Sequence, residues 1–237
     1  MIPGTLCDGR LFAAQARRLR SVAQVIVLDY QTLRAREPWL RGLLNALPER
    51  FSVAGFSLGG LWALELLRRA PQRIERLALI ASNAQPAGAA ARRRSEAMRK
   101  RWLAHGRQRS HVELARRAEP EYFHDQTKRR RHRGLLVRMA AGTRGRAALQ
   151  QFSWAAERPA GLDVLATFRR PLLIVSGDHD RICPTLLQQR MAMAQPLARW
   201  LRIPRCGHFI PLEAPSRLSD ALCQWMFRPT QPTGQPT

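Results

Sequence analysis

Several common features are scarce or missing in this sequence, and each absence narrows the function. No apolar run reaches the roughly 20 residues that a membrane-spanning helix needs, so we expect no membrane span. No secretory leader is recognisable, which makes the cytoplasm the expected location. The cysteines show neither CxxC nor any other metal-ligand spacing, so we expect packed free thiols and neither a metal nor an organic cofactor: Cys7, Cys183, Cys206 and Cys223.

Acidic residues and lysine are also scarce. The chain holds 17 Asp and Glu against 40 Lys and Arg, and only Lys100 and Lys128 are lysines. Residues 86–150 contain 18 Lys and Arg against 5 Asp and Glu, and the densest run is KRRRHR at 128–133. Such a field attracts nucleic acid, an anionic membrane or an acidic carrier protein. Three interpretations stay open: the arginine content of a GC-rich genome, docking of an acidic partner, and nucleic-acid binding. The third is disfavoured because no nucleic-acid module or stacking aromatic pattern is recognisable.

A G-x-S-x-G pentapeptide, GFSLG at 55–59, is the most informative motif. It follows a short apolar run at 51–54 and precedes a helical pattern at 61–67. In this strand–turn–helix setting a serine becomes a nucleophile, here Ser57. The helix that begins after it points backbone N–H groups at developing negative charge. The pentapeptide alone is weak, so the prediction depends on a partner acid and base.

An acid and a base follow in the chain. The continuously apolar run 171–175 is typical of a buried parallel strand, and it leads into Asp178 and Asp180. Carboxylates just past such a strand lie where parallel sheets place their ligand chemistry. A further strand-like run, 200–203, leads into His208. The order nucleophile, acid, base is the order of the α/β-hydrolases.

The chain resembles the α/β-hydrolase superfamily, in its branch of small esterase-like enzymes with a helical cap. The matching segments run from the first residues to about Pro215 and are PGTL at 3–6, GFSLGG at 55–60, GDHD at 177–180 with Pro184, and GH at 207–208 with Glu213 and Pro215. The resemblance selects Asp180 as the acid, because it stands in Gly-x-x-Asp with a proline four residues on. Asp178 stays open as the alternative, although it also suits a turn residue that bonds its own backbone.

The roles follow from the chemistry and the resemblance. Ser57 attacks, His208 accepts its proton and later returns it, and Asp180 orients the imidazole. The oxyanion is expected to bind the backbone N–H of Leu58 and, by resemblance, that of Thr5.

We therefore expect a serine hydrolase that cleaves a carboxylic ester or thioester through an acyl-enzyme. We expect it to act on a small ester or acyl substrate. An acidic acyl carrier protein stays open as a binding partner. The alternatives are other triad chemistry (lactonase, lyase, perhydrolase, acyl-carrier-protein ester hydrolase) and a non-catalytic arginine-rich protein, on a decayed hydrolase scaffold, that binds nucleic acid or an acidic partner.

Alternating strand and helix patterns predict an α/β fold, with a mostly parallel sheet flanked by helices. The expected core spans 1–83 and 164–227, a helical cap spans 84–163, and a disordered tail spans 228–237. Strands are expected at 24–29, 50–54, 76–81, 171–176 and 199–203, and helices at 8–19, 38–46, 60–70, 185–193 and 215–226. We expect cap side chains to line the substrate pocket unless they form the cap's own core: Trp102, Tyr122, Phe123, Met139, Phe152 and Trp154.

The N-terminus departs from the pattern that the resemblance implies. The strand before the oxyanion loop normally lies inside the sheet, but only residues 1–3 precede Gly4. Unpaired ladder groups would cost roughly 1–3 kcal/mol each if buried. The sequence therefore predicts an N-terminally truncated fold, whose natural start lies further upstream. In-frame codons before Met1 test this expectation.

Overall fold

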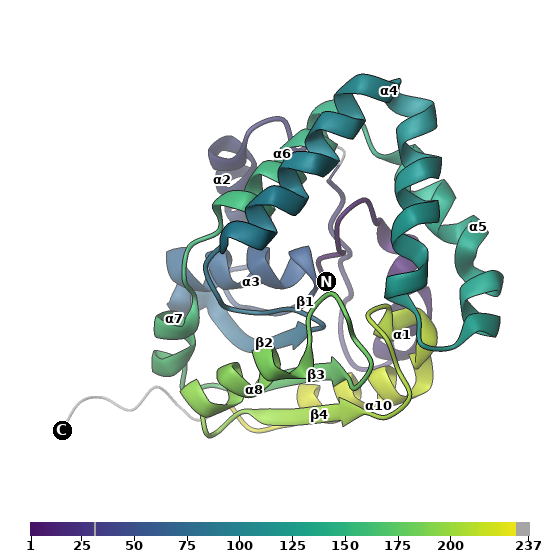
Figure 1. Ribbon diagram of the computed structural model, residues 1–237. Coiled ribbons are helices and arrows are strands. Elements are labelled where there is room, and N and C mark those ends of the chain that lie inside the picture. The colour runs from purple at the N-terminus through teal and green to yellow at the C-terminus, as the bar shows by residue number, and fades with distance from the viewer. Residues whose placement is uncertain (31, 231–237) are drawn as a thin grey trace.

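Four parallel strands form the sheet, in the order β1-β2-β3-β4. They are β1 (Phe51–Phe56), β2 (Ile74–Ile80), β3 (Leu172–Gly177) and β4 (Arg199–Ile203). The computed structural model describes residues 1–30 and 32–230, with the backbone alone for 105–120. Neighbouring strands are connected through helices, as parallel pairing requires, and Figure 1 shows helices on both sides of the sheet. The predicted α/β architecture is confirmed.

Side chains alternate along each strand and so feed two separate cores. Apart from three helices described below, the helical elements are η1 (Gly9–Phe12), α1 (Ala13–Leu19), α2 (Arg36–Ala46), α3 (Leu58–Arg69), η2 (Pro71–Arg73), α7 (Leu162–Thr167), α8 (Thr185–Ala194), α9 (Ile210–Glu213) and α10 (Pro215–Met226). Phe56 and Ile80 point to the core that α1 and α10 complete, whereas Val53, Leu77 and Ile174 point to the core that α2, α3, α7 and α8 complete.

Between β2 and α7 the chain forms α4 (Ala89–Tyr122), α5 (Gln126–Gly142) and α6 (Gly145–Glu157). Figure 1 shows these helices arching over the sheet, with α4 against both α5 and α6. Trp102 of α4 meets Phe152 of α6 edge to face, with ring centroids 5.8 Å apart. Both rings are buried in one cluster with Leu6, so α4 and α6 pack directly on the N-terminal loop.

The segment predicted as a strand at 24–29 is not one in the structure. It runs beside Met1 and Ile2, which separate it from β1. Ile2 N–H donates to Ala54 O at 2.8 Å, and Leu28 N–H donates to Met1 O at 2.9 Å. Because only two residues stand between β1 and this segment, the pairing stops at one isolated parallel bridge, Ile2 with Gly55.

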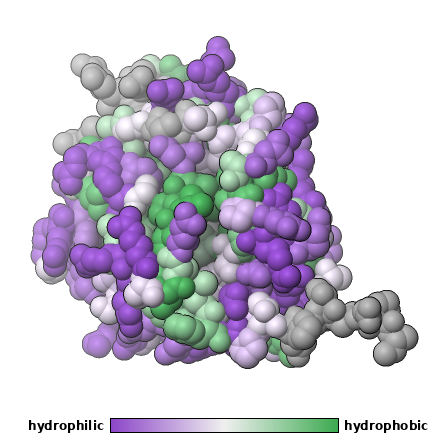
Figure 2. Space-filling model, turned by 180° about the vertical axis from the view of Figure 1, so that it is seen from behind, coloured by the Kyte–Doolittle hydropathy of each residue, from purple (hydrophilic) through white to green (hydrophobic). Residues whose placement is uncertain are grey.

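The other predicted strands lie within a few residues of β1 to β4. The helix predicted at 8–19 starts as the 3₁₀ turn η1, in which Asp8 accepts from Arg10 N–H as the N-cap. Residues 231–237 of the predicted disordered tail lie outside the described residues. No helix within the described part of the chain is long and apolar enough to cross a bilayer. Figure 2 shows hydrophilic side chains over most of the rear face, with apolar ones gathered near its middle.

Candidate active site

Ser57 stands on the turn between β1 and α3 in an unusual backbone conformation. Its φ is 52° and its ψ is −115°, a region that residues other than glycine rarely occupy. The turn is tight enough to exclude side chains on either side. A Cβ on Gly55 would collide with the Gly59 carbonyl, and a Cβ on Gly59 would collide with the Ile2 carbonyl. The glycines therefore allow the sharp turn that lifts the Ser57 hydroxyl above the sheet.

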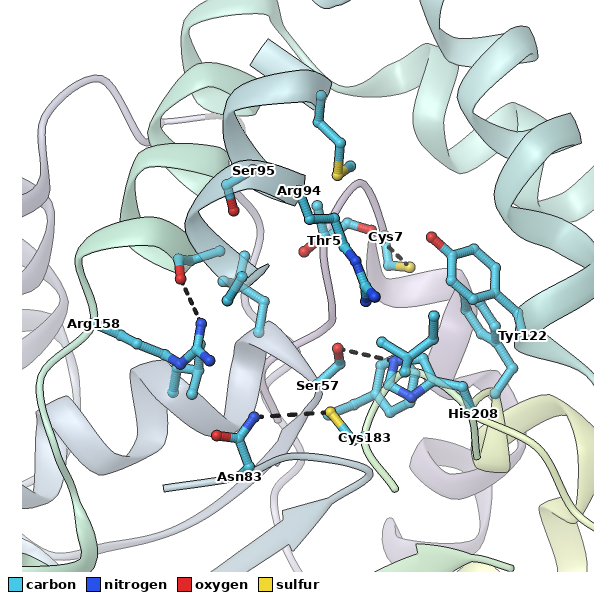
Figure 3. Close-up of a pocket in the computed structure, with 18 residues that line it drawn as sticks. Thr5, Cys7, Ser57, Asn83, Arg94, Ser95, Tyr122, Arg158, Cys183 and His208 are labelled. Carbon is cyan, nitrogen blue, oxygen red and sulfur yellow. Dashed lines mark hydrogen bonds between the residues drawn. The ribbon is translucent and has the colours of Figure 1, made fainter. Parts of the chain in front are cut away.

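The structure brings Ser57, His208 and Asp180 together. His208 Nε2 lies 3.0 Å from Ser57 Oγ, and His208 Nδ1 lies 2.8 Å from Asp180 Oδ2. An ionised Asp180 can only accept, which places the imidazole proton on Nδ1 and leaves Nε2 to accept from the hydroxyl. Asp180 Oδ1 accepts from the N–H groups of Ile182 and Cys183, both at 2.8 Å. Both the imidazole and the carboxylate are buried, and Figure 3 shows His208 directed at Ser57.

Asp178, the alternative acid, points elsewhere. Its Oδ1 lies 2.6 Å from Nδ1 of its neighbour His179 and also accepts from Cys206 N–H. The ring of His179 in turn packs against that of His124, with the centroids 3.8 Å apart and the planes tilted by 35°. The geometry therefore favours Asp180 as the partner of His208.

Leu58 and Thr5, the two residues expected to bind the oxyanion, lie at the cavity that contains Ser57. Leu58 is the first residue of α3, where an N–H has no intrahelical partner. Leu6 N–H donates to Gln151 Oε1 of α6 at 2.7 Å, which holds the N-terminal loop. Within the described part of the chain, the N–H groups of Leu58 and Thr5 have no acceptor. Both residues line the same cavity as Ser57.

A cavity of about 210 Å³ opens above Ser57, and its lining corrects the substrate-pocket prediction. Tyr122 lines it, but the other five candidates do not, and Phe152 is buried with Trp102 in one cluster. Trp102, Phe123, Met139 and Trp154 are instead buried in core clusters. Large apolar side chains gain most from full burial, so they fill the cap–core interface. Trp154, for example, stacks on Trp62 of α3 with ring centroids 4.9 Å apart.

The lining includes polar residues that the sequence interpretation missed: Asn83, Arg94, Ser95 and Arg158. They come from the β2–α4 loop, α4 and the end of α6, and no local motif marks them. Cys183 also lines the cavity, but burial and the nearby Asp180 raise the pKa of its thiol to about 12. A thiol with that pKa stays protonated near neutral pH and is a poor nucleophile.

Glu213 is a buried carboxylate that connects the cap to the loop of His208. Its oxygens accept from the N–H groups of His124, Asp125 and Gly207, at 2.9–3.0 Å for the shortest bond to each. Burial raises the pKa of this carboxyl above its ordinary value, even though the N–H donors oppose the rise. Glu213 therefore holds the residue before His208 in place.

Comparison with known proteins gives consistent results. Residues 2–221 match the sequence profile described as the alpha/beta hydrolase family. The chain is 29% identical to pimeloyl-[acyl-carrier protein] methyl ester esterase of Aromatoleum aromaticum, over 73% of this chain and 72% of that protein. Among solved structures it resembles a thermophilic esterase of Thermogutta terrifontis (23% identity, TM-score 0.78, 95% of this chain, 87% of that chain). It also resembles the enol-lactonase of Burkholderia xenovorans (18%, 0.77, 96% and 90%). At these identities, the two structures establish a shared fold.

Proposed function

This chain belongs to the alpha/beta hydrolase family, and on that premise we propose that it hydrolyses a carboxylic ester or thioester through a covalent acyl-enzyme. The observation that carries the proposal is the continuous hydrogen-bond chain from Ser57 Oγ through His208 to Asp180, with links of 3.0 and 2.8 Å. A hydroxyl alone is a weak nucleophile, and this arrangement supplies the base that activates it.

Acylation begins when Ser57 Oγ attacks the ester carbonyl carbon and its proton passes to His208 Nε2. The Asp180 carboxylate stabilises the resulting imidazolium and keeps it oriented. The carbonyl oxygen becomes an oxyanion, for which the N–H groups of Leu58 and Thr5 are the proposed donors. One such donor contributes about 3 kcal/mol of transition-state stabilisation in comparable sites.

The tetrahedral intermediate then collapses. His208 returns the proton to the leaving oxygen or sulfur as the bond to the carbonyl carbon breaks, which releases an alcohol or thiol. In the second half, water attacks the acyl carbon while His208 takes a proton from it. His208 then gives that proton to Ser57 Oγ, and the carboxylic acid leaves.

Covalent labelling tests the proposal. A fluorophosphonate probe should add its mass to the peptide that contains Ser57, and Ser57→Ala should abolish labelling. Ser95→Ala is the matched control, because Ser95 lines the same cavity, no histidine among the described side chains bonds it, and its loss should leave labelling intact. Labelling that persists in Ser57→Ala would place the nucleophile elsewhere and overturn the proposal.

We further propose that an acyl carrier protein delivers the acyl group. The relative from Aromatoleum aromaticum is named for a carrier-protein ester. Here α5 begins four residues after Tyr122, which lines the cavity, and it carries a basic surface suited to an acidic partner. Its exposed residues are Arg130, Arg131 and Arg133, whereas Lys128 and Arg129 of the same run are half-buried.

Charge reversal tests the carrier proposal. The double variant Arg130→Glu/Arg131→Glu should lower kcat/KM for an acyl-carrier ester about tenfold or more relative to the free methyl ester of the same acid. The effect should shrink as salt is raised, because exposed charges are screened. An unchanged ratio of the two substrates at low salt would contradict docking on α5.

A further inference from the structure

The cavity above Ser57 contains two cationic side chains, Arg94 and Arg158, and among the described residues that line it none is Asp or Glu. We propose that Arg94, assisted by Arg158, binds a carboxylate carried by the ester substrate. This inference rests on the proposed hydrolase function and adds to it the substrate class: an ester that also bears a free carboxylate.

Arg94 reaches the cavity because of its place on α4. In the first turns of this helix the cavity-lining residues are Ala91, Arg94, Ser95 and Met98, which recur at the spacing of one helical face. Figure 3 shows the Arg94 side chain extending from α4 toward Ser57 and His208. Its guanidinium is therefore directed at the position where a bound ester would react.

Arg94 also differs from other arginines of the protein. Arg69 bonds Glu37 and Glu65 at 2.6–2.7 Å, and Arg99 bonds Glu96 at 3.0 Å. Arg94 makes no ion pair or hydrogen bond with any residue in the described part of the chain. Its planar guanidinium can thus bind a carboxylate in a bidentate contact without breaking a hydrogen bond within the protein.

Arg158 lies at the end of α6 and is held by the backbone. Its Nε donates to Gln85 O at 3.1 Å, and its Nη1 donates to Ala155 O. The side chain is half-buried, and burial lowers the pKa of its guanidinium. Within the described residues no carboxylate pairs with it, whereas charged groups removed from water are ordinarily paired. An anionic ligand would supply the missing counter-charge to Arg158, and Arg94, which is exposed at the edge of the same cavity, is available to contact that anion as well.

The cavity of about 210 Å³ limits the ligand to a small molecule or a short acyl arm. The carboxylate could belong to the acyl part of the ester or to its leaving group. A comparison of monomethyl glutarate with methyl pentanoate tests for a carboxylate on the acyl part, because the two esters differ only in a terminal carboxylate or methyl group. A comparison of O-acetyl-lactate with isopropyl acetate tests in the same way for a carboxylate on the leaving group. Titration of released acid at constant pH follows all four substrates.

The expected result is a higher kcat/KM for the anionic member of at least one pair. Arg94→Gln should lower that anionic-to-neutral ratio about 10- to 100-fold, the size of a lost charge-assisted hydrogen bond. Arg94→Lys should lower the ratio less, because lysine keeps the positive charge but lacks the planar guanidinium that binds a carboxylate through two parallel hydrogen bonds. Arg93→Gln removes the same charge from an exposed position on α4 outside the cavity lining, and it should leave the ratio unchanged.

Inhibition by free glutarate gives a second readout of the same contact. Arg94→Gln should raise the inhibition constant of glutarate more than that of pentanoate. A wild-type ratio at or below one for both pairs, or a ratio that Arg94→Gln leaves unchanged, would overturn the inference while probe labelling of Ser57 keeps the hydrolase proposal standing. Loss of both ester turnover and Ser57 labelling in the wild type would overturn both.

Discussion

Replacement of Asp180 by Asn should nearly abolish turnover through the tautomer of His208. In the structure Asp180 Oδ1 accepts from Ile182 and Cys183 N–H groups. An Asn at this position would place its amide oxygen on those two donors, because its NH₂ cannot accept. The NH₂ would then face His208 Nδ1, which must become an acceptor. The imidazole proton would then sit on Nε2. A protonated Nε2 cannot accept the proton of the Ser57 hydroxyl.

The expected loss is about 10⁴-fold in kcat, which corresponds to about 5.4 kcal/mol of transition-state stabilisation. Release of p-nitrophenol from p-nitrophenyl acetate measures it, and the thermal midpoint verifies that the variant is folded. Asp178→Asn is the matched control, since Asp178 bonds His179 and not His208. A similar loss in both variants would refute the tautomer argument, and a large loss confined to Asp178→Asn would reassign the acid.

Three further predictions concern the packing around the site. Gly59→Ala should prevent folding or abolish probe labelling, because the added Cβ would collide with backbone atoms. Gly42→Ala is the control: this position on α2 has open space around it, so urea titrations should show the free energy of unfolding raised by about 0.5–1 kcal/mol. Trp154→Ala should lower the free energy of unfolding by about 3–5 kcal/mol, because the ring is buried against Trp62; a loss below 1 kcal/mol would contradict this packing. The pKa of the Cys183 thiol is raised to about 12, so at pH 8 it should react with a disulfide reagent far more slowly in the native protein than in the unfolded protein. The reaction of the native thiol should become faster as the pH rises. Rapid labelling of this residue in the native protein would be inconsistent with its burial.

Local signals in the sequence were sufficient for most of the framework. The strand–turn–helix around Ser57 depends on neighbours within about ten residues, so its glycines and apolar run could be recognised directly. The same holds for α10, whose bounds agree with the predicted 215–226. The segment 24–29 shows the opposite case. Its residues suit a strand, but a strand needs a partner, and only two residues lie between it and β1.

Which residues line the cavity could be learned only from the tertiary structure. Trp102, Phe123, Met139 and Trp154 looked like pocket residues because they are large and apolar, yet those properties also favour burial between cap and core. Arg94, one of many arginines in the cap, carries no local mark at all. By itself the sequence determined the family, the parallel core and the order in which Ser57, the two aspartates and His208 follow the strands. Only the packing of distant segments decided which acid meets His208 and which side of α4 faces Ser57, because those contacts join residues whose separation along the chain no local pattern encodes.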